Sequence, residues 1–247
     1  MQSLPKQGVS VVIAVYNEID NIEPLLSEVQ QSLSDLEKFE VVVVDDASKD
    51  GTFQKLQELL KRYPQLRIVQ HKQNYGQSIA VINGVKAAVY DWVITLDGDG
   101  QNNPADFALL FTALDNLKTT RPVLVAGIRA KRNDRWIRRI SSKIANKIRD
   151  SLLKDGCPDS ACGLKLFQRK IFLQLPHFNH LHRFLPALYT RADGLIINVP
   201  VNHRPRVHGQ SKYGTLNRLW IGIIDILGVM WLIRRPCPLE TCDGSSP

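Results

Sequence analysis

The stretch WVITLDGDGQ, residues 92–101, places two aspartates and an amide directly after an apolar run. The run at residues 92–96 has the composition of a buried strand, and the glycines after it free the backbone to turn. Asp97 and Asp99 can then approach one ligand. Carboxylate oxygens suit a hard cation such as Mg²⁺, which substrate phosphates commonly help to hold. An ordinary Asp/Gly turn has the same composition. Other parts of the chain must therefore distinguish a metal site from a plain turn.

Other apolar runs alternate with segments of helical spacing. Strands are expected at residues 9–15, 41–44, 66–69, 92–96, 122–127 and 195–199, with a short one entered from a loop at 159–167. Helices are expected at residues 21–36, from 51 to 60, at 78–89 and at 182–189. Because the strands are nearly unbroken Val, Ile and Leu, they predict a parallel sheet covered on both faces. The fold class is therefore α/β.

Polar residues follow three of these strands. They are Tyr-Asn-Glu at 16–18, two aspartates at 45–46, and the acidic turn at 97–101. Ligands of parallel α/β sheets bind outside the carboxyl ends of the strands, so these residues predict one site, with base or ribose hydroxyls at the first two clusters and a metal at the third. The glycine loops of dehydrogenases and P-loop enzymes are absent from the sequence.

The chain of 247 residues has a globular composition, 44% hydrophobic and 23% charged, with a formal charge of +8. One segment of it is strongly basic. Between residues 129 and 149 a single acid, Asp134, stands against Arg129, Lys131, Arg132, Arg135, Arg138, Arg139, Lys143, Lys147 and Arg149. Such a segment suits phosphates of a nucleotide, a lipid, a membrane surface or a nucleic acid, although a solvated helix face has the same composition.

The cysteines bear on location. With no signal peptide recognisable at the N-terminus, Cys157, Cys162, Cys237 and Cys242 are expected to be reduced thiols of a cytoplasmic protein. Their C-x4-C spacing matches no zinc signature.

The predicted organisation is one domain, residues 1–215, with a C-terminal appendage at 216–247. Residues 219–233 are apolar or glycine except Asp225, and Arg234 and Arg235 follow. As a helix this run is about 22 Å long, short of the roughly 30 Å hydrocarbon core. An interfacial helix is the preferred interpretation, with a buried core helix and the stub of a membrane region as alternatives. The expected location is the cytoplasmic face of a membrane, peripheral or monotopic.

The chain resembles glycosyltransferases of family 2 with the GT-A fold, and among them the dolichyl-phosphate mannose synthase-like polyprenyl-phosphate sugar transferases. The matching stretches, in the family's order, are SVVIAVYNE (10–18), VVDDASKDGT (43–52), NYGQSIAVING (74–84), ITLDGDGQNNP (94–104), DSACGLKLF (159–167) and HRPRVHGQSKY (203–213). Two departures are mild: Ala14 stands where many relatives have proline, and Gly98 where many have alanine. They leave GDP and UDP both open.

The resemblance implies a role for each matching residue. The residues implied to bind the nucleotide sugar are Ala14, Tyr16, Glu18, Val44, Asp46, Gly98, Arg206 and Lys212. Those implied to hold Mg²⁺ or Mn²⁺ with the diphosphate are Asp97, Asp99 and Gln101. The acceptor phosphate would meet Arg129, Arg138, Arg139, Arg206 and Lys212, and the catalytic group would be Asp97, Asp99, Arg129 and Asp159.

The implied reaction is a single inverting displacement in which an acceptor lipid phosphate attacks the anomeric carbon of a nucleotide sugar. The expected partners are thus a nucleotide sugar, a polyprenyl phosphate and a membrane surface. GDP-mannose is the preferred donor, and a UDP-sugar is the alternative. Asp159 is a candidate base or positioning residue, although a loop aspartate before small residues can equally be only a cap.

Three rival functions account for part of the sequence. A processive polysaccharide synthase would carry a Q-x-x-R-W segment, whereas Arg132 here occupies the glutamine position before Arg135 and Trp136. A nucleic-acid-binding protein would leave the acidic strand ends unexplained, so no nucleic-acid partner is expected. A non-catalytic sugar-nucleotide sensor needs most of the same residues and remains an alternative.

Overall fold

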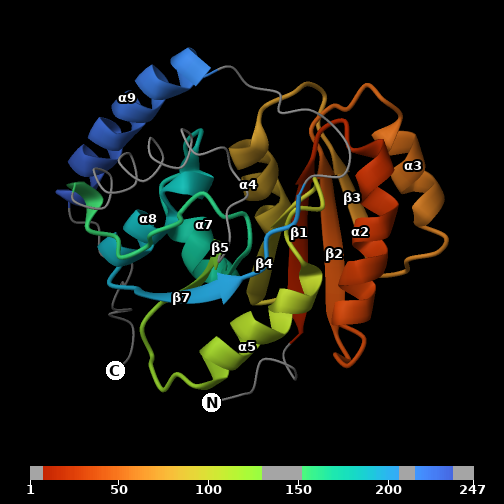
Figure 1. The fold of residues 1–247 in the computed structure, drawn as a ribbon, viewed down its shortest axis with the longest axis horizontal. Coiled ribbons are helices and arrows are strands. Elements are labelled where there is room, and N and C mark those ends of the chain that lie inside the picture. The colour runs from red at the N-terminus through yellow and green to blue at the C-terminus, as the bar shows by residue number, and fades with distance from the viewer. Residues whose placement is uncertain (1–7, 130–151, 206–214, 236–247) are drawn as a thin grey trace, which may run out of the picture.

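A computed structural model describes residues 8–129, 152–205 and 215–235 (Figure 1). Its centre is a seven-stranded sheet in the order β3-β2-β1-β4-β6-β5-β7. The strands are β1 (Val9–Val15), β2 (Phe39–Asp45), β3 (Leu66–Gln70), β4 (Trp92–Asp97), β5 (Val123–Arg129), β6 (Lys165–Gln168) and β7 (Leu195–Val201). All are parallel to one another except β6, which runs antiparallel between β4 and β5. The predicted α/β fold with a mostly parallel sheet is confirmed.

The register of the central strands brings the polar clusters to one edge. In the parallel pairs of β1, Val15 lies opposite Asp45 of β2, and Ala14 lies opposite Asp97 of β4. Strands paired in this way end together, so the residues that follow them share the carboxyl edge of the sheet. The antiparallel β6 then returns the chain from this edge.

Helices cover both faces of the sheet. One core joins the sheet to α2 (Ile19–Ser32), α3 (Thr52–Leu59) and α5 (Phe107–Asp115). The opposite core joins it to α4 (Gln77–Ala87), α7 (Arg169–Gln174) and α8 (Leu185–Arg191). Each face therefore buries an apolar layer, which explains why the strands carry continuous apolar runs rather than alternating ones.

Some boundaries differ from the prediction. The helix expected at residues 21–36 ends at Ser32, and Leu60, expected on the apolar side of α3, is 42% exposed. The helix expected at 182–189 divides into a 3₁₀ turn, η2 (Leu181–Arg183), and α8, and a second turn, η1 (Pro104–Asp106), precedes α5. Neither α5 nor α7 was predicted, because these segments are helical owing to their packing on the sheet rather than to a clear local pattern.

The C-terminal helix α9 (Thr215–Ile233) lies beside α8 at the side of the molecule (Figure 1). Val229 is buried against Phe184 and Ala187, so one side of α9 belongs to a small core. Another side is exposed and apolar, and we call it the α9 stripe: Ile223, Ile224, Leu227 and Trp231. Among the described residues, no helix has the length and hydropathy required of a bilayer-crossing segment.

Candidate functional site

The loops after β1 and β2 interlock. Asn17, with a positive φ of 53°, donates its backbone N–H to the Ser48 hydroxyl at 2.8 Å and accepts from the backbone of Lys49 at 2.7 Å. The backbone N–H of Glu18 donates to the Thr52 hydroxyl at 3.0 Å. These bonds fix the turn between Tyr16 and Glu18, two predicted nucleotide ligands, against the loop after β2. Both side chains are half-buried there.

Two more predicted nucleotide ligands lie within the strands. Val44 is completely buried in the core, so any contact it makes with a nucleotide would come from its backbone. Ala14 is half-buried beside it, at the position opposite Asp97. A β-carbon added at Gly98 would lie 2.6 Å from a methyl of Val15, which means that the alanine of many relatives would require Val15 to move.

Asp46 is buried and held from three sides. It accepts from the backbone N–H groups of Tyr75 and Gly76, each at 2.8 Å, and its Oδ1 lies 2.7 Å from Nδ1 of His71. The other ring nitrogen of His71 lies 2.9 Å from the side-chain amide of Asn83. Asp46 therefore ties the N-terminal end of α4 to β2, and its contact with a nucleotide stays a prediction.

Asp97, at the end of β4, lies among groups of both charges. Burial and the neighbouring charge of Asp99 raise its pKa from 3.8 to about 6, while the positive charges of Lys165 and Arg129 lower it. The side-chain amide of Gln77 donates to Asp97 Oδ1 at 2.7 Å. A carboxylate that is costly to ionise next to a second carboxylate is a group that a cation would stabilise.

The donor set around Asp97 fits a hard divalent cation. Asp97 and Asp99 supply carboxylate oxygens and Gln101 an amide oxygen, the ligand types that Mg²⁺ and Mn²⁺ prefer. Among the residues that the structure describes, no three His, Cys, Asp or Glu side chains gather as a metal site. An ion held here would leave positions in its shell for water or substrate phosphates, which is how Mg²⁺ is commonly bound.

A glycine lets the chain pass close to Asp97. A β-carbon at Gly163 would fall 2.3 Å from the Asp97 carboxylate, so no larger residue fits while Asp97 keeps this position. Thr95 donates to the Gly163 carbonyl at 2.7 Å and holds this approach in place. Lys165, only 2% exposed, donates to the carbonyl of Cys162 in the same loop.

Arg129 and Asp159 form a two-point ion pair. Arg129 donates from Nε to Oδ2 at 2.7 Å and from a terminal nitrogen to Oδ1 at 2.6 Å, and its backbone N–H also reaches Oδ2. Burial by itself lowers the pKa of Arg129, but the hydrogen bonds and charge of Asp159 raise it above the ordinary value. This geometry fits Asp159 as a positioning residue for Arg129 better than as a base.

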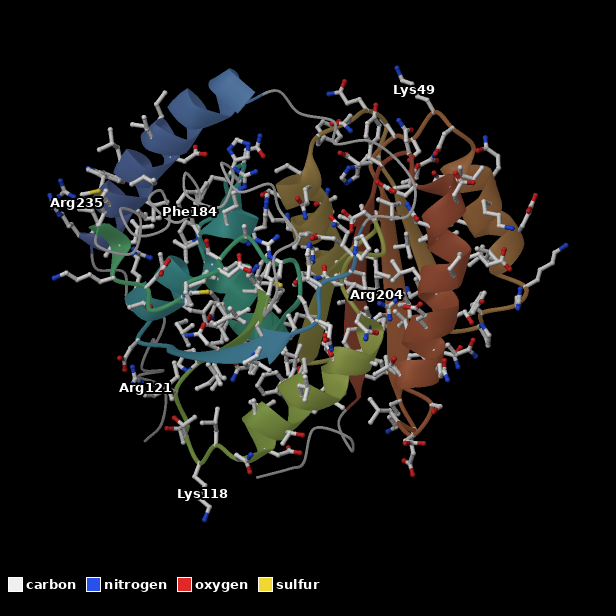
Figure 2. All side chains as sticks on the ribbon, in the orientation of Figure 1. Lys49, Lys118, Arg121, Phe184, Arg204 and Arg235 are labelled. Carbon is white, nitrogen blue, oxygen red and sulfur yellow. The ribbon has the colours of Figure 1, made fainter. Side chains whose placement is uncertain are left out.

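The loop that carries the predicted metal ligands, residues 97–103 and called the metal loop from here on, is covered by the segment that follows β7. Arg204 donates its backbone N–H to the Gln101 carbonyl at 2.8 Å, and the Gln101 side-chain amide donates to the Arg204 carbonyl at 3.3 Å. Asn102 forms an antiparallel bridge with His203. Figure 2 shows Arg204 near the middle of the molecule beside α2, so residues far apart in the sequence meet at the loop.

Not every predicted residue can be placed. Arg138, Arg139, Arg206 and Lys212 lie outside the described residues, as do most of the basic segment and Cys237 and Cys242. Their roles stay predictions. Cys157 and Cys162 are buried thiols.

Sequence reasoning did not assign roles to several residues of the site. They are His71, Gln77, Lys165 and Arg204, together with Ser78, whose hydroxyl lies 2.7 Å from Nδ1 of the half-buried His182. Burial lowers the pKa of His182 well below its usual value, so it is neutral there. Gln77 and Lys165 stand inside the recognised stretches, but only the folded chain shows which carboxylate they face.

Residues 10–175 match the family described as glycosyl transferase family 2. The chain is 35% identical to undecaprenyl-phosphate 4-deoxy-4-formamido-L-arabinose transferase from Edwardsiella ictaluri, covering 98% of this chain and 69% of that protein. It is 32% identical to dodecaprenyl-phosphate galacturonate synthase from Rhizobium johnstonii, covering 91% of this chain and 67% of that protein.

Solved structures share the fold. A mannosyltransferase from Pyrobaculum calidifontis, in complex with GDP-Man and Mn²⁺, superposes with a TM-score of 0.64 at 23% identity, covering 93% of this chain and 65% of that one. Glucosyl-3-phosphoglycerate synthase from Mycobacterium tuberculosis, in complex with Mn²⁺, UDP-glucose and glycerol 3-phosphate, gives 0.64 at 19% identity, covering 95% and 82%. The predicted GT-A fold is confirmed.

Proposed function

This chain belongs to glycosyl transferase family 2, and from that premise we propose that it transfers a sugar from a nucleotide diphosphate to a polyprenyl phosphate. Two relatives of at least 32% identity are named as polyprenyl-phosphate sugar enzymes, which supports this acceptor. The observation that carries the proposal is the meeting of Asp97 and Asp99 with the Arg129–Asp159 pair near the carboxyl edge of the sheet.

We change the preferred donor from GDP-mannose to a UDP-linked sugar. The sequence favoured GDP-mannose, with a UDP-sugar as the alternative, and the named relatives support the alternative better because their sugars are a formamido-arabinose and a galacturonate. The GDP-mannose complex is only 23% identical to this chain and bears on the fold alone. We therefore take a UDP-linked sugar as the donor.

Asp97, Asp99 and Gln101 would hold Mg²⁺ or Mn²⁺, and the ion would stabilise negative charge on the departing diphosphate. The chain's own cations supply the rest of the charge. Arg129, oriented by Asp159, and Lys165 both act electrostatically on Asp97, so they lie close enough to influence phosphate groups bound there. Arginine suits phosphate because its planar fork can donate two parallel hydrogen bonds.

The displacement itself requires little base catalysis. An oxygen of the lipid phosphate forms the new bond to the anomeric carbon while the bond from that carbon to the diphosphate oxygen breaks, and the electron pair leaves with the nucleoside diphosphate. A phosphate monoester, with a second pKa of about 6, is already largely dianionic at neutral pH. This is consistent with Asp159 being engaged by Arg129 rather than placed as a proton acceptor.

A lipid acceptor also gives the α9 stripe a function. Ile224, Leu227 and Trp231 are 59 to 66% exposed, and Arg235 stacks on the Trp231 ring at 5.4 Å from its centroid. Apolar side chains flanked by cations are typical of helices that lie in the headgroup region of an anionic membrane. We propose that α9 rests on the cytoplasmic face of the membrane that carries the acceptor.

The test is transfer from a panel of UDP- and GDP-linked pentoses, hexoses and uronates to a polyprenyl phosphate in the presence of Mg²⁺ or Mn²⁺. We expect a lipid-phosphate-linked sugar from a UDP donor, no product with EDTA, and none with Asp99→Asn. The matched control is Asp115→Asn, an acid on α5 away from the site. Binding of UDP-sugars without transfer to any lipid phosphate would favour a non-catalytic sensor.

A further inference from the structure

We infer that Arg204 is a positioning residue for the metal loop and that it sets the orientation of the Gln101 amide. The inference rests on the proposed function, because Gln101 matters here as a ligand of the metal and its diphosphate. Arg204 is not among the residues for which the sequence implied a role. Its contacts join three parts of the chain that are distant in sequence.

The backbone of Arg204 holds Gln101 from two directions. It donates to the Gln101 carbonyl at 2.8 Å and accepts from the Gln101 side-chain nitrogen at 3.3 Å. The backbone N–H of Gln101 in turn donates to Asp99 Oδ1 at 3.1 Å. Because the amide nitrogen is directed to Arg204, the amide oxygen is the atom left to serve as a metal ligand, and oxygen is the ligand that a hard cation prefers. The segment after β7 therefore decides which end of this amide serves the metal.

The side chain of Arg204 fixes that backbone in place. One terminal nitrogen lies 2.9 and 2.8 Å from the two carboxylate oxygens of Glu28, on the well-packed helix α2. The other terminal nitrogen donates to Oδ1 of Asn103, which also accepts from the backbone of Ala105 at the start of η1. A planar guanidinium can make both contacts at once, whereas a lysine ammonium lacks the fork that spans them.

A second anchor lies two residues before Arg204 in the chain. Asn202 donates its backbone N–H to Asp106 at 2.7 Å and its side-chain amide to the same carboxylate at 2.8 Å. Asp106 is buried, so this contact holds the end of β7 to η1 whether or not Arg204 is present. Loss of Arg204 should thus loosen the metal loop without detaching the whole segment.

The Arg204–Glu28 pair contributes little to global stability, because each side chain is 39% exposed. This separates a positioning role from a structural one. Arg204→Ala should shift the melting temperature by at most about 3 °C yet weaken Mn²⁺ binding roughly tenfold, the range found when an outer partner of a metal ligand is removed.

The experiment measures Mn²⁺ affinity by electron paramagnetic resonance at saturating UDP, together with hydrogen exchange of residues 101–103 in the metal-free protein. We compare wild type, Arg204→Ala, Arg204→Lys and Glu28→Gln, and use Arg62→Ala as the matched control, since Arg62 pairs with Glu23 on the same helix α2. All the site variants are expected to bind Mn²⁺ more weakly and to exchange faster than wild type. The control is expected to match wild type in both assays. The double variant Glu28→Gln/Arg204→Ala should bind Mn²⁺ no more weakly than Arg204→Ala.

Unchanged Mn²⁺ affinity in Arg204→Ala would overturn the inference, and so would an equal loss in Arg62→Ala. Hydrogen exchange keeps the two proposals apart. If wild type binds neither Mn²⁺ nor UDP but the exchange rates still respond to Arg204, the proposed function fails while the positioning of the loop by Arg204 holds.

Discussion

Arg129, the last residue of β5, and Asp159, in the loop before β6, meet in a two-point ion pair with contacts of 2.6 and 2.7 Å. The side chains are 15% and 7% exposed, so each charge depends on the other for its compensation. The pair joins the cationic side of the site to the loop that passes under Asp97. It supports the proposal that Asp159 positions Arg129 rather than acting as a base.

Removing Asp159 should leave a largely buried arginine without its two-point partner. We expect Asp159→Ala to destabilise the protein by roughly 3 to 5 kcal/mol, measured by urea unfolding, and Asp159→Asn, which keeps an acceptor, to cost less. If Asp159 only positions Arg129, the residual turnover of Asp159→Asn should keep the shape of the wild-type pH profile. Loss of an acidic limb in that variant would restore Asp159 as the base.

Asp97 should make the metal-free protein less stable at neutral pH than near pH 5. Its pKa in the folded protein is raised from 3.8 to about 6, so the folded state binds this proton more tightly than the unfolded chain does. Its contribution to the free energy of unfolding is therefore favourable below its unfolded pKa, falls as pH rises through about 6, and stays low above that.

The variant Asp97→Asn should remove this dependence. At neutral pH and without metal we expect a gain of roughly 1 to 3 kcal/mol in the free energy of unfolding, since one pKa unit corresponds to about 1.4 kcal/mol. The same variant should lose transferase activity and Mn²⁺ binding. A neutral-pH stability equal to that of wild type would show that the ionised carboxylate carries no such cost.

Gly163 should tolerate no β-carbon. Gly163→Ala would bring a methyl within 2.3 Å of the Asp97 carboxylate, which must then move. We expect Mn²⁺ affinity and turnover to fall at least tenfold, as for other displacements of metal ligands, with the fold retained by circular dichroism. Gly228→Ala is the control, because a β-carbon at that position meets nothing within 4 Å. Equal turnover in the two variants would contradict the close approach.

The α9 stripe should govern binding to lipid vesicles. Burying a side chain such as Ile or Leu contributes roughly 1.5 to 3 kcal/mol, so Ile224→Asn with Leu227→Asn should weaken binding to anionic vesicles by at least tenfold, measured by co-sedimentation. Lys118→Ala, an exposed residue far from α9 in Figure 2, should bind as wild type does. Vesicle binding that survives the double change would assign the membrane contact to another surface.

Much of the fold could be predicted from the sequence because the apolar pattern of a buried strand is a local property. Buried parallel strands must be apolar throughout, and β1, β2 and β4 were recognised for that reason, together with the polar residues that follow them. By contrast α5 and the antiparallel direction of β6 depend on which surface each segment meets, and no local pattern records that.

The α/β class, the family and the acidic turn after β4 could be inferred from the order of the residues, because strand periodicity and motif order are properties of neighbouring residues. The partners are visible only in the folded chain: Asp159 with Arg129, Gln77 with Asp97, and Arg204 with the metal loop. Such pairs come from strands and loops far apart in the chain. The fold brings these side chains within hydrogen-bonding distance, and for the largely buried Arg129–Asp159 pair the exclusion of water also strengthens the contact.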